Sequence, residues 1–196
     1  MFRKSTVTMA CLAVALSGGL YVSTAHADAT GNQPSASEQS AQNWCAQKGG
    51  KAIDYSPWYH TNNPKPTPLG GSYSMCRFTN KDGTRIVVAA DSLAADRPTQ
   101  AALAYMLKPA VPPAPNGSNP SAWYCTKIGG TVQFGGGPAD VGGWAPSSEK
   151  APQDFEFMCV FADRSMIDTW GLAYHTNGVI RGADLTGKWK ATMPKN

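Results

Sequence analysis

Two stretches of the chain repeat the same pattern of apolar and polar positions. In each, apolar residues first recur at the spacing of a helix and then at the spacing of short strands. In the first stretch, a mostly apolar stripe at three- and four-residue spacing predicts a helix that ends near Lys48. Ser35 and Glu38 precede the stripe at capping-box spacing, and Gly49-Gly50 follows it, where glycine takes the left-handed conformation that ends a helix. The stripe consists of Ala41, Trp44, Cys45 and Lys48.

After this helix the spacing becomes that of short strands. We predict strands at residues 51–55, 73–78 and 84–90, with a glycine- and proline-rich loop at 56–71 between the first two. Asp82-Gly83, between the second and third, is a strong hairpin signal. The first stretch therefore predicts a helix packed on a small antiparallel meander.

The second stretch repeats this order with different residues. Asn119 is its cap candidate, Pro120 suits the first helical position, and Gly129-Gly130 ends the helix. We predict strands at 131–134, 155–161 and 165–174, a long loop at 135–152, and a weaker turn at Asp163-Arg164.

Between the two stretches, residues 96–108 predict a short helix that Pro109 stops. The proline-rich residues 109–118 then form a semi-rigid linker. Beyond the second stretch, Asn177-Gly178 predicts a turn, and the tail from Gly187 to Asn196 carries no assignable pattern.

The cysteines follow the same duplication. Cys45 and Cys76 lie 31 residues apart, and Cys125 and Cys159 lie 34 apart, each with two glycines four and five residues after the first cysteine. Four cysteines allow three pairings, and the duplication favours one bridge in each copy. Each bridge contributes roughly 3–4 kcal/mol in the chain-entropy model. We interpret them as structural, since no C-x-x-C motif is present.

These patterns predict an α+β fold of two tandem small disulfide-stapled modules, each a helix packed on a short antiparallel meander. The first module spans residues 28–108, the linker 109–118, and the second module with the C-terminal tail 119–196.

Residues 1–27 have the architecture of a secretory signal peptide. Arg3 and Lys4 precede an apolar run at 9–16, and Ala25-His26-Ala27 is an A-x-A cleavage site. A lipoprotein with Cys11 acylated is the alternative, although no apolar segment precedes that cysteine. We therefore expect a periplasmic or secreted protein, in a compartment where disulfides persist.

Net charge and hydropathy argue against two classes of protein, those that bind nucleic acid and those with a transmembrane helix. The chain has 17 basic and 13 acidic residues, and loss of Arg3 and Lys4 leaves 15 basic residues and a net charge of +2. Dispersed and balanced charge argues against nucleic acid as a partner. No segment after the leader approaches the length of a transmembrane helix.

The second stretch, and more loosely the first, resembles a small bacterial domain of unknown function, number three-three-three, whose members carry the label haemolysin. Members read roughly N-P-A-S-x-Y-C-x-x-x-G-G, then C-x-F-x-D-G-S, then a tryptophan. Arg164 departs from this pattern by replacing the turn glycine, and the loop at 135–152 is long. The resemblance implies a small secreted or envelope domain and no established reaction. The matching residues are Asn119, Pro120, Tyr124, Cys125, Gly129, Gly130, Cys159, Phe161, Asp163, Ser165 and Trp170.

Groups that could perform catalysis or bind a metal are few. His60 and His175 are the histidines left after the leader, and they fall at non-equivalent positions of the duplication. They could still meet across the copies, with Met75, Met158 or Met166 as soft partners for copper, but the ligand spacing of a metal site is absent. We therefore predict no metal, no cofactor and no catalytic residue.

The candidate binding residues are Trp58, Tyr59 and Trp144, which lie in the predicted loops beside proline or glycine. Loops on a rigid scaffold carry much of protein recognition, and aromatic residues dominate its energy. The alternative is that these rings fold back over a thin core. By contrast, Trp44, Trp123 and Trp170 sit on periodic apolar faces and are predicted to be core.

These observations favour a non-catalytic binding module of the cell envelope or medium, for example an inhibitor of a protease or another hydrolase, with a protein or envelope partner. A membrane-active protein that uses residues 99–108 as its contact helix is the alternative. An enzyme that uses His60 or His175, or a metal-binding protein, is a further one.

Overall fold

The computed structural model describes residues 34–133, 142–175 and 180–194. The leader with Cys11 and the turn at Asn177-Gly178 lie outside these residues. The helices are α1 (Ala36–Gln47), α2 (Ala90–Ala94), α3 (Gln100–Leu107), α4 (Pro120–Lys127) and α5 (Thr169–His175). The strands are β1 (Lys51–Tyr59), β2 (Thr67–Pro68), β3 (Tyr73–Thr79), β4 (Arg85–Ala89), β5 (Thr131–Gln133), β6 (Gly143–Pro146), β7 (Met158–Val160) and β8 (Met166–Asp168).

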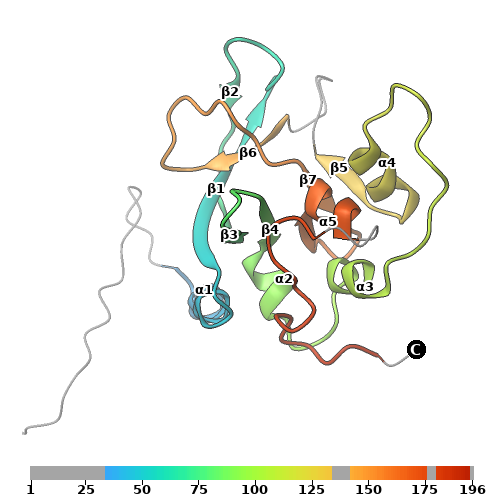
Figure 1. Cartoon of the computed structure of the whole chain (residues 1–196). Helices are drawn as coiled ribbons and strands as arrows, with labels where there is room; N and C mark the ends of the chain where they lie inside the picture. Colours follow the sequence, from blue (N-terminus) through green and yellow to red (C-terminus); the bar gives the residue numbers. More distant parts are fainter. Residues whose placement is uncertain (1–33, 134–141, 176–179, 195–196) are drawn as a thin grey trace, which may run out of the picture. The chain divides into compact units, whose positions relative to one another are not determined.

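The strands form one antiparallel sheet in the order β2-β1-β3-β4-β8-β7-β5, and β6 pairs with β1 (Figure 1). The two halves of the chain meet where β4 pairs with β8, through Val88 and Ile167. Trp144 of β6 also bridges Glu156, just before β7. Because β6 contacts both β1 and the segment that leads into β7, the sheet curls toward itself.

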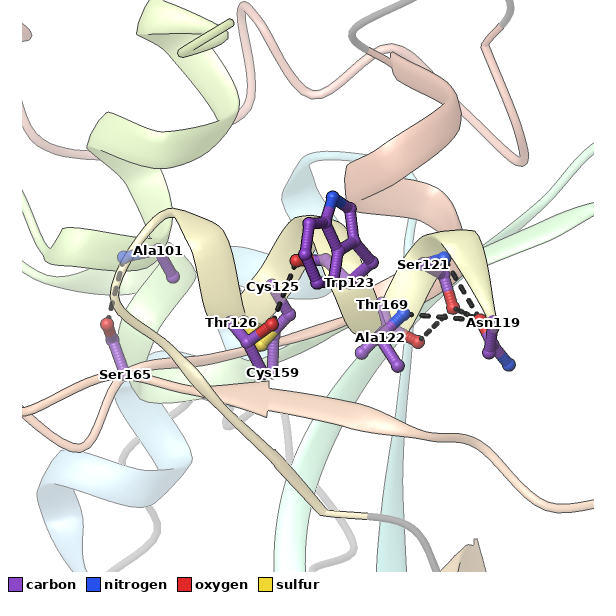
Figure 2. Close-up of a disulfide and its surroundings, with 10 residues drawn as sticks. All are labelled: Ala101, Asn119, Ser121, Ala122, Trp123, Cys125, Thr126, Cys159, Ser165 and Thr169. Atoms are coloured by element: carbon purple, nitrogen blue, oxygen red, sulfur yellow. Dashed lines mark hydrogen bonds between the residues drawn. A yellow bond between two sulfur atoms is a disulfide. The ribbon is translucent and has the colours of Figure 1, made fainter. Parts of the chain in front are cut away.

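Each half uses a disulfide to fasten its first helix to its middle strand. Cys45 of α1 pairs with Cys76 of β3, and Cys125 of α4 pairs with Cys159 of β7, with Cα–Cα distances of 5.6 and 5.7 Å. Figure 2 shows the second disulfide beneath α4. The pairing predicted from the duplication is confirmed.

The second glycine of each Gly-Gly pair lets the backbone pass close to its disulfide. A Cβ on Gly50 would lie 2.9 Å from Cys45 Sγ, and a Cβ on Gly130 would lie 2.7 Å from Cys125 Sγ. Both separations are shorter than van der Waals contact, so these positions require glycine for space.

The helix caps also follow the sequence prediction. Ser35 Oγ accepts a hydrogen bond from Glu38 N at 3.2 Å, and Asn119 Oδ1 accepts from Ser121 N and Ala122 N (Figure 2). Each bond satisfies a backbone donor that a helix N-terminus leaves unpaired. Ser121 Oγ then donates to Thr169 Oγ1 at 3.1 Å, which ties α4 to the start of α5.

The two faces of the sheet bury different clusters. Side chains at alternate positions of β4 separate onto these faces, Ile86 and Val88 toward the cluster that contains both disulfides, and Val87 and Ala89 toward the other. The disulfide cluster includes residues of α1, α3, α4 and α5. The second, inner cluster consists of Tyr55, Met75, Val87, Ala89, Trp144, Met158 and Met166.

Residues 180–194 complete the disulfide cluster. They include the described part of the tail from Gly187 onward, for which the sequence predicted no structure. Leu185 and Trp189 are buried, and Trp189 packs on Tyr105 of α3 with ring centroids 5.9 Å apart. Trp44 Nε1 donates to the Lys188 carbonyl at 2.8 Å, and Lys188 Nζ donates to the Lys48 carbonyl at 2.8 Å. The end of the chain thus packs on the first half (Figure 1).

Three predicted elements differ from the structure. The strand predicted at 165–174 ends at Asp168, because the Asp168 carboxylate accepts from Gly171 N and starts α5. The loop predicted at 135–152 contains β6, which pairs with β1 from the other half of the chain. The strand predicted at 51–55 continues to Tyr59 for the same reason. The fold is α+β with two disulfides, and the two predicted meanders share one sheet.

Candidate functional site

A cleft of about 600 Å³ lies between the two halves of the chain. Its walls come from both halves: the start of β3 and α2 on one side, β6 and the turn between β7 and β8 on the other. This volume is in the range of small-ligand sites. The lining is mixed: Asp91, Asp163 and Arg164 bring charge, and most of the remaining residues are small polar or apolar side chains. The residues that carry its chemistry are Tyr73, Asp91, Gln133, Trp144 and Arg164.

Two aromatic side chains on the walls are held by hydrogen bonds. Trp144 Nε1 donates to Gln133 Oε1 at 2.9 Å, which fixes the indole in the cleft wall. The Tyr73 hydroxyl donates to Asp91 Oδ2. Burial raises the pKa of Tyr73 and the bond to Asp91 raises it further, so the phenol stays protonated at neutral pH. The aromatic walls are therefore oriented before any ligand arrives.

The turn between β7 and β8 is organised by Asp163. Its carboxylate accepts from Ser165 N at 3.1 Å, from Ser165 Oγ at 2.6 Å and from Gln100 N at 2.8 Å. Partial burial raises the pKa of Asp163, but the hydrogen bonds from Ser165 and Gln100 outweigh it and lower the pKa. Ser165 Oγ also accepts from Ala101 N, so the turn is fixed to the start of α3 (Figure 2).

Arg164 occupies an unusual backbone conformation in this turn. Its φ is 67°, in the left-handed region, and its side chain is exposed at the cleft. The corresponding turn of the first half has Gly83 there, with φ 82°. Glycine adopts this conformation without the steric cost that a side chain adds.

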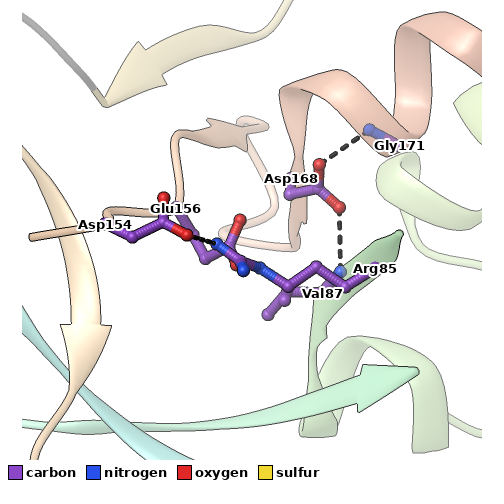
Figure 3. A network of polar contacts seen from close by, with 6 residues as sticks. All are labelled: Arg85, Val87, Asp154, Glu156, Asp168 and Gly171. Atoms are coloured by element: carbon purple, nitrogen blue, oxygen red, sulfur yellow. Dashed lines mark hydrogen bonds and ion pairs between the residues drawn. The ribbon is translucent and has the colours of Figure 1, made fainter. Parts of the chain in front are cut away.

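Near the start of β4 lies a set of polar groups in which Glu156 and Asp168 are buried and Asp154 is exposed (Figure 3). Arg85 pairs with Glu156 and with Asp154, the latter at 2.5 Å. The Asp168 carboxylate accepts from Val87 N at 2.8 Å and from Gly171 N at 2.7 Å. Burial raises the pKa of Asp168 to about 7, and the charge of Glu156 adds to the rise. We interpret this network as structural, because its hydrogen bonds join β4 to α5.

The burial of Trp58 and Trp144 agrees with the alternative that they cover the core, whereas the three tryptophans predicted as core are less buried than expected. Trp58 and Trp144 lie in strands rather than loops and are 6% and 8% exposed. Trp58 packs on Phe155 at 6.1 Å, so the alternative, that the predicted loop rings cover the core, describes this residue. Trp44, Trp123 and Trp170, predicted as core, are only half-buried.

Of the three predicted binding residues, Trp144 lines the cleft, whereas Trp58 and Tyr59 do not. Tyr59 is half-buried and stacks on His60 with ring centroids 3.7 Å apart. Whether any of the three contacts a partner stays a prediction.

The histidines pack against different tyrosines. His60 stacks on Tyr59, and His175 stacks on Tyr105 at 3.6 Å. Burial lowers the pKa of His175 to about 4, and the charge of Lys108 lowers it too, so this imidazole is neutral at pH 7. The three methionines suggested as copper partners, Met75, Met158 and Met166, lie together in the inner cluster.

Sequence reasoning missed Tyr73, Asp91 and Arg164 as site residues. Arg164 left a signal, since it replaces the glycine expected in a hairpin turn. Tyr73 and Asp91 left none, because β3 and α2 reach the cleft only through the curl of the sheet.

Comparison of the chain with protein-family models, with curated proteins and with solved structures gave no match. The resemblance stated above therefore stays a prediction. None of the helices in the described residues is long and apolar enough to cross a membrane.

Proposed function

We propose that this chain is an exported, non-catalytic binding module that holds a ligand in the cleft between its two halves. The observation that carries the proposal is Arg164. A side chain in the left-handed conformation costs about 1 kcal/mol, and the equivalent turn of the same chain avoids that cost with glycine. Strained residues at a cleft are a recognised sign of function.

The chemistry of the cleft indicates the kind of ligand. An arginine guanidinium pairs with carboxylate or phosphate through two parallel hydrogen bonds. Beside it, the half-buried Tyr73 and the edges of the buried Trp144 and Met166 offer apolar surface. We therefore propose a ligand with one acidic group and an apolar body.

The wider organisation supports this function. Each disulfide fixes a helix to the strand beside it, so two braced halves face one another across the cleft. The shared order of helix, glycine pair and disulfide supports our proposal that the halves are tandem modules of common design. The disulfides also support export to the periplasm or the medium, where such bonds persist.

The test compares wild type with Arg164→Gly. This substitution removes the guanidinium and suits the backbone, so stability should stay unchanged or rise by up to about 1 kcal/mol. Thermal-shift titration with carboxylate- and phosphate-bearing amphiphiles should give hits for wild type that Arg164→Gly loses. The matched control, Gly83→Arg, should lower stability and keep those hits. Equal hits in wild type and Arg164→Gly would refute the proposal.

Inhibition of a hydrolase is a second candidate, favoured by the segment between β1 and β3. Leu69 is 38% exposed there, follows Pro68, and is fixed by a hydrogen bond from its N–H to the Pro57 carbonyl at 2.9 Å. An exposed apolar side chain on an anchored loop can insert into the substrate pocket of a hydrolase. Leu69→Asp should abolish inhibition of a panel of secreted proteases if this candidate holds, and absence of inhibition by wild type would remove it.

The membrane-active alternative stays a prediction. The structure turns the apolar side of α3 inward, since Ala101, Ala102, Ala104 and Tyr105 are buried. Leu107 is exposed at the end of that helix. A dye-leakage assay on vesicles tests this alternative directly.

A further inference from the structure

A second groove, separate from the cleft, lies between the proline-rich linker and helices α4 and α5. Its volume is about 440 Å³, and its floor and walls include Trp123, Trp170 and Tyr174. These three rings are half-buried or exposed, and Tyr174 is 40% exposed. Trp170 and Tyr174 stack at 5.6 Å and form one continuous aromatic wall.

The chain itself shows what this kind of surface accepts. Trp123 Nε1 donates to the Pro112 carbonyl at 2.9 Å, and the Tyr124 hydroxyl donates to the Pro109 carbonyl at 3.1 Å. Aromatic donors to the carbonyls of an extended proline-rich segment are the contacts by which aromatic-lined grooves bind proline-rich peptides. The linker therefore occupies one wall of the groove in this manner, and the Trp170–Tyr174 wall presents similar aromatic groups opposite.

Three cations lie at or beside the groove. Lys127 Nζ lies 4.2 Å from the centroid of the Trp123 ring, and Arg181 Cζ lies 6.0 Å from that of Trp170. Lys108 lines the groove, and no carboxylate among the described residues does. Cations at an interface favour acidic partners and accelerate their association.

We propose that the Trp170–Tyr174 wall binds an extended, proline-containing peptide with acidic residues at its ends, contributed by a partner protein. The proline rings pack on the stacked aromatic pair, and the acidic ends face Lys108, Lys127 and Arg181. This site shares no residue with the cleft, so it stands or falls independently of the function proposed above.

The test is fluorescence polarisation at low salt with three labelled peptides, EEPAVPPAPEE, KKPAVPPAPKK and EEAAVAAAAEE. The first should bind the oxidised protein, and the other two should bind at least about tenfold more weakly. Tyr174→Ala should weaken binding of the first peptide about tenfold, as loss of an aromatic anchor does. Arg181→Ala should weaken binding and reduce its salt dependence.

The matched control is Leu107→Ala, since Leu107 is 43% exposed and lies outside this groove. It should bind the first peptide as wild type does, and circular dichroism should show that every variant is folded. Equal binding of the proline-free or the lysine peptide overturns the proposal, as does binding unaffected by Tyr174→Ala. A dimer of wild type that Tyr174→Ala dissociates would also overturn it, by making a second copy the occupant.

Discussion

Replacing Asp168 with asparagine tests how the two halves are joined. Asp168 is 2% exposed, and its two oxygens accept from Gly171 N at 2.7 Å and Val87 N at 2.8 Å. In Asp168→Asn the amide has one oxygen, so one buried N–H loses its acceptor. Leaving such a donor unpaired costs about 1–3 kcal/mol. We expect that loss at pH 4.5.

The loss should then shrink as the pH rises. Burial raises the pKa of Asp168 from 3.8 to about 7, so between those values the folded chain holds a proton that the unfolded chain has released. The free energy of unfolding of wild type therefore falls with rising pH in this window, by at most about 1.4 kcal/mol per pH unit from this group. Asp168→Asn lacks this contribution, so the gap between the two proteins narrows as the pH rises. It should reverse before pH 7.5, because roughly three pH units at that slope amount to about 4 kcal/mol, more than the initial loss.

Urea unfolding followed by tryptophan fluorescence, at half-unit steps from pH 4.5 to 8, measures this gap. The control is Asp163→Asn, because hydrogen bonds from Ser165 and Gln100 lower the pKa of Asp163 despite its partial burial. The stabilising effect of the Asp163 carboxylate is complete above the unfolded pKa of 3.8 and is lost only at lower pH, so the gap between wild type and Asp163→Asn should stay nearly constant from pH 4.5 to 8. A gap for Asp168→Asn that stays constant or widens would refute the reasoning, since the two backbone donors would then outweigh burial.

Three further outcomes test the packing. Trp189→Ala should lower the free energy of unfolding by about 3–5 kcal/mol, because the ring is buried on Tyr105, and urea titration checks this. Gly130→Ala should cost about 1–3 kcal/mol, since its Cβ would press on the disulfide, and an unchanged melting temperature would contradict it. Reducing agent without denaturant should leave Cys125–Cys159 intact at pH 8, because both cysteines are 0% exposed, and thiol-specific labelling with mass spectrometry would reveal the contrary.

The features that the sequence predicted are local. Ser35 and Asn119 act as caps through hydrogen bonds that span two or three residues, so their spacing in the sequence carries the information. The disulfide pairing was recoverable because duplication supplied a second copy of the pattern. The turn at Asp82-Gly83 likewise depends on adjacent residues only.

The features that the sequence did not predict depend on contacts between residues that lie far apart in the chain. Residues 169–174 were predicted as part of a strand, and Trp170 and Tyr174 are residue types that favour strands. Asp168 instead starts a helix there and also accepts a hydrogen bond from Val87 N of the first half. Trp144 became buried because β6 pairs with β1, about ninety positions earlier in the chain. The sequence therefore indicated two residues of the cleft, Trp144 and the anomalous turn residue Arg164. It did not indicate that these two residues lie at one site.

The position of the last described residues constrains when the protein can fold. Leu185 and Trp189 pack in the same buried cluster as residues of α1 and α3, which lie about eighty or more positions earlier in the chain. During synthesis the amino-terminal half therefore emerges with its interior open and stays incomplete until residues 185–189 have been made. Deletion of these residues should therefore damage the half that was made first.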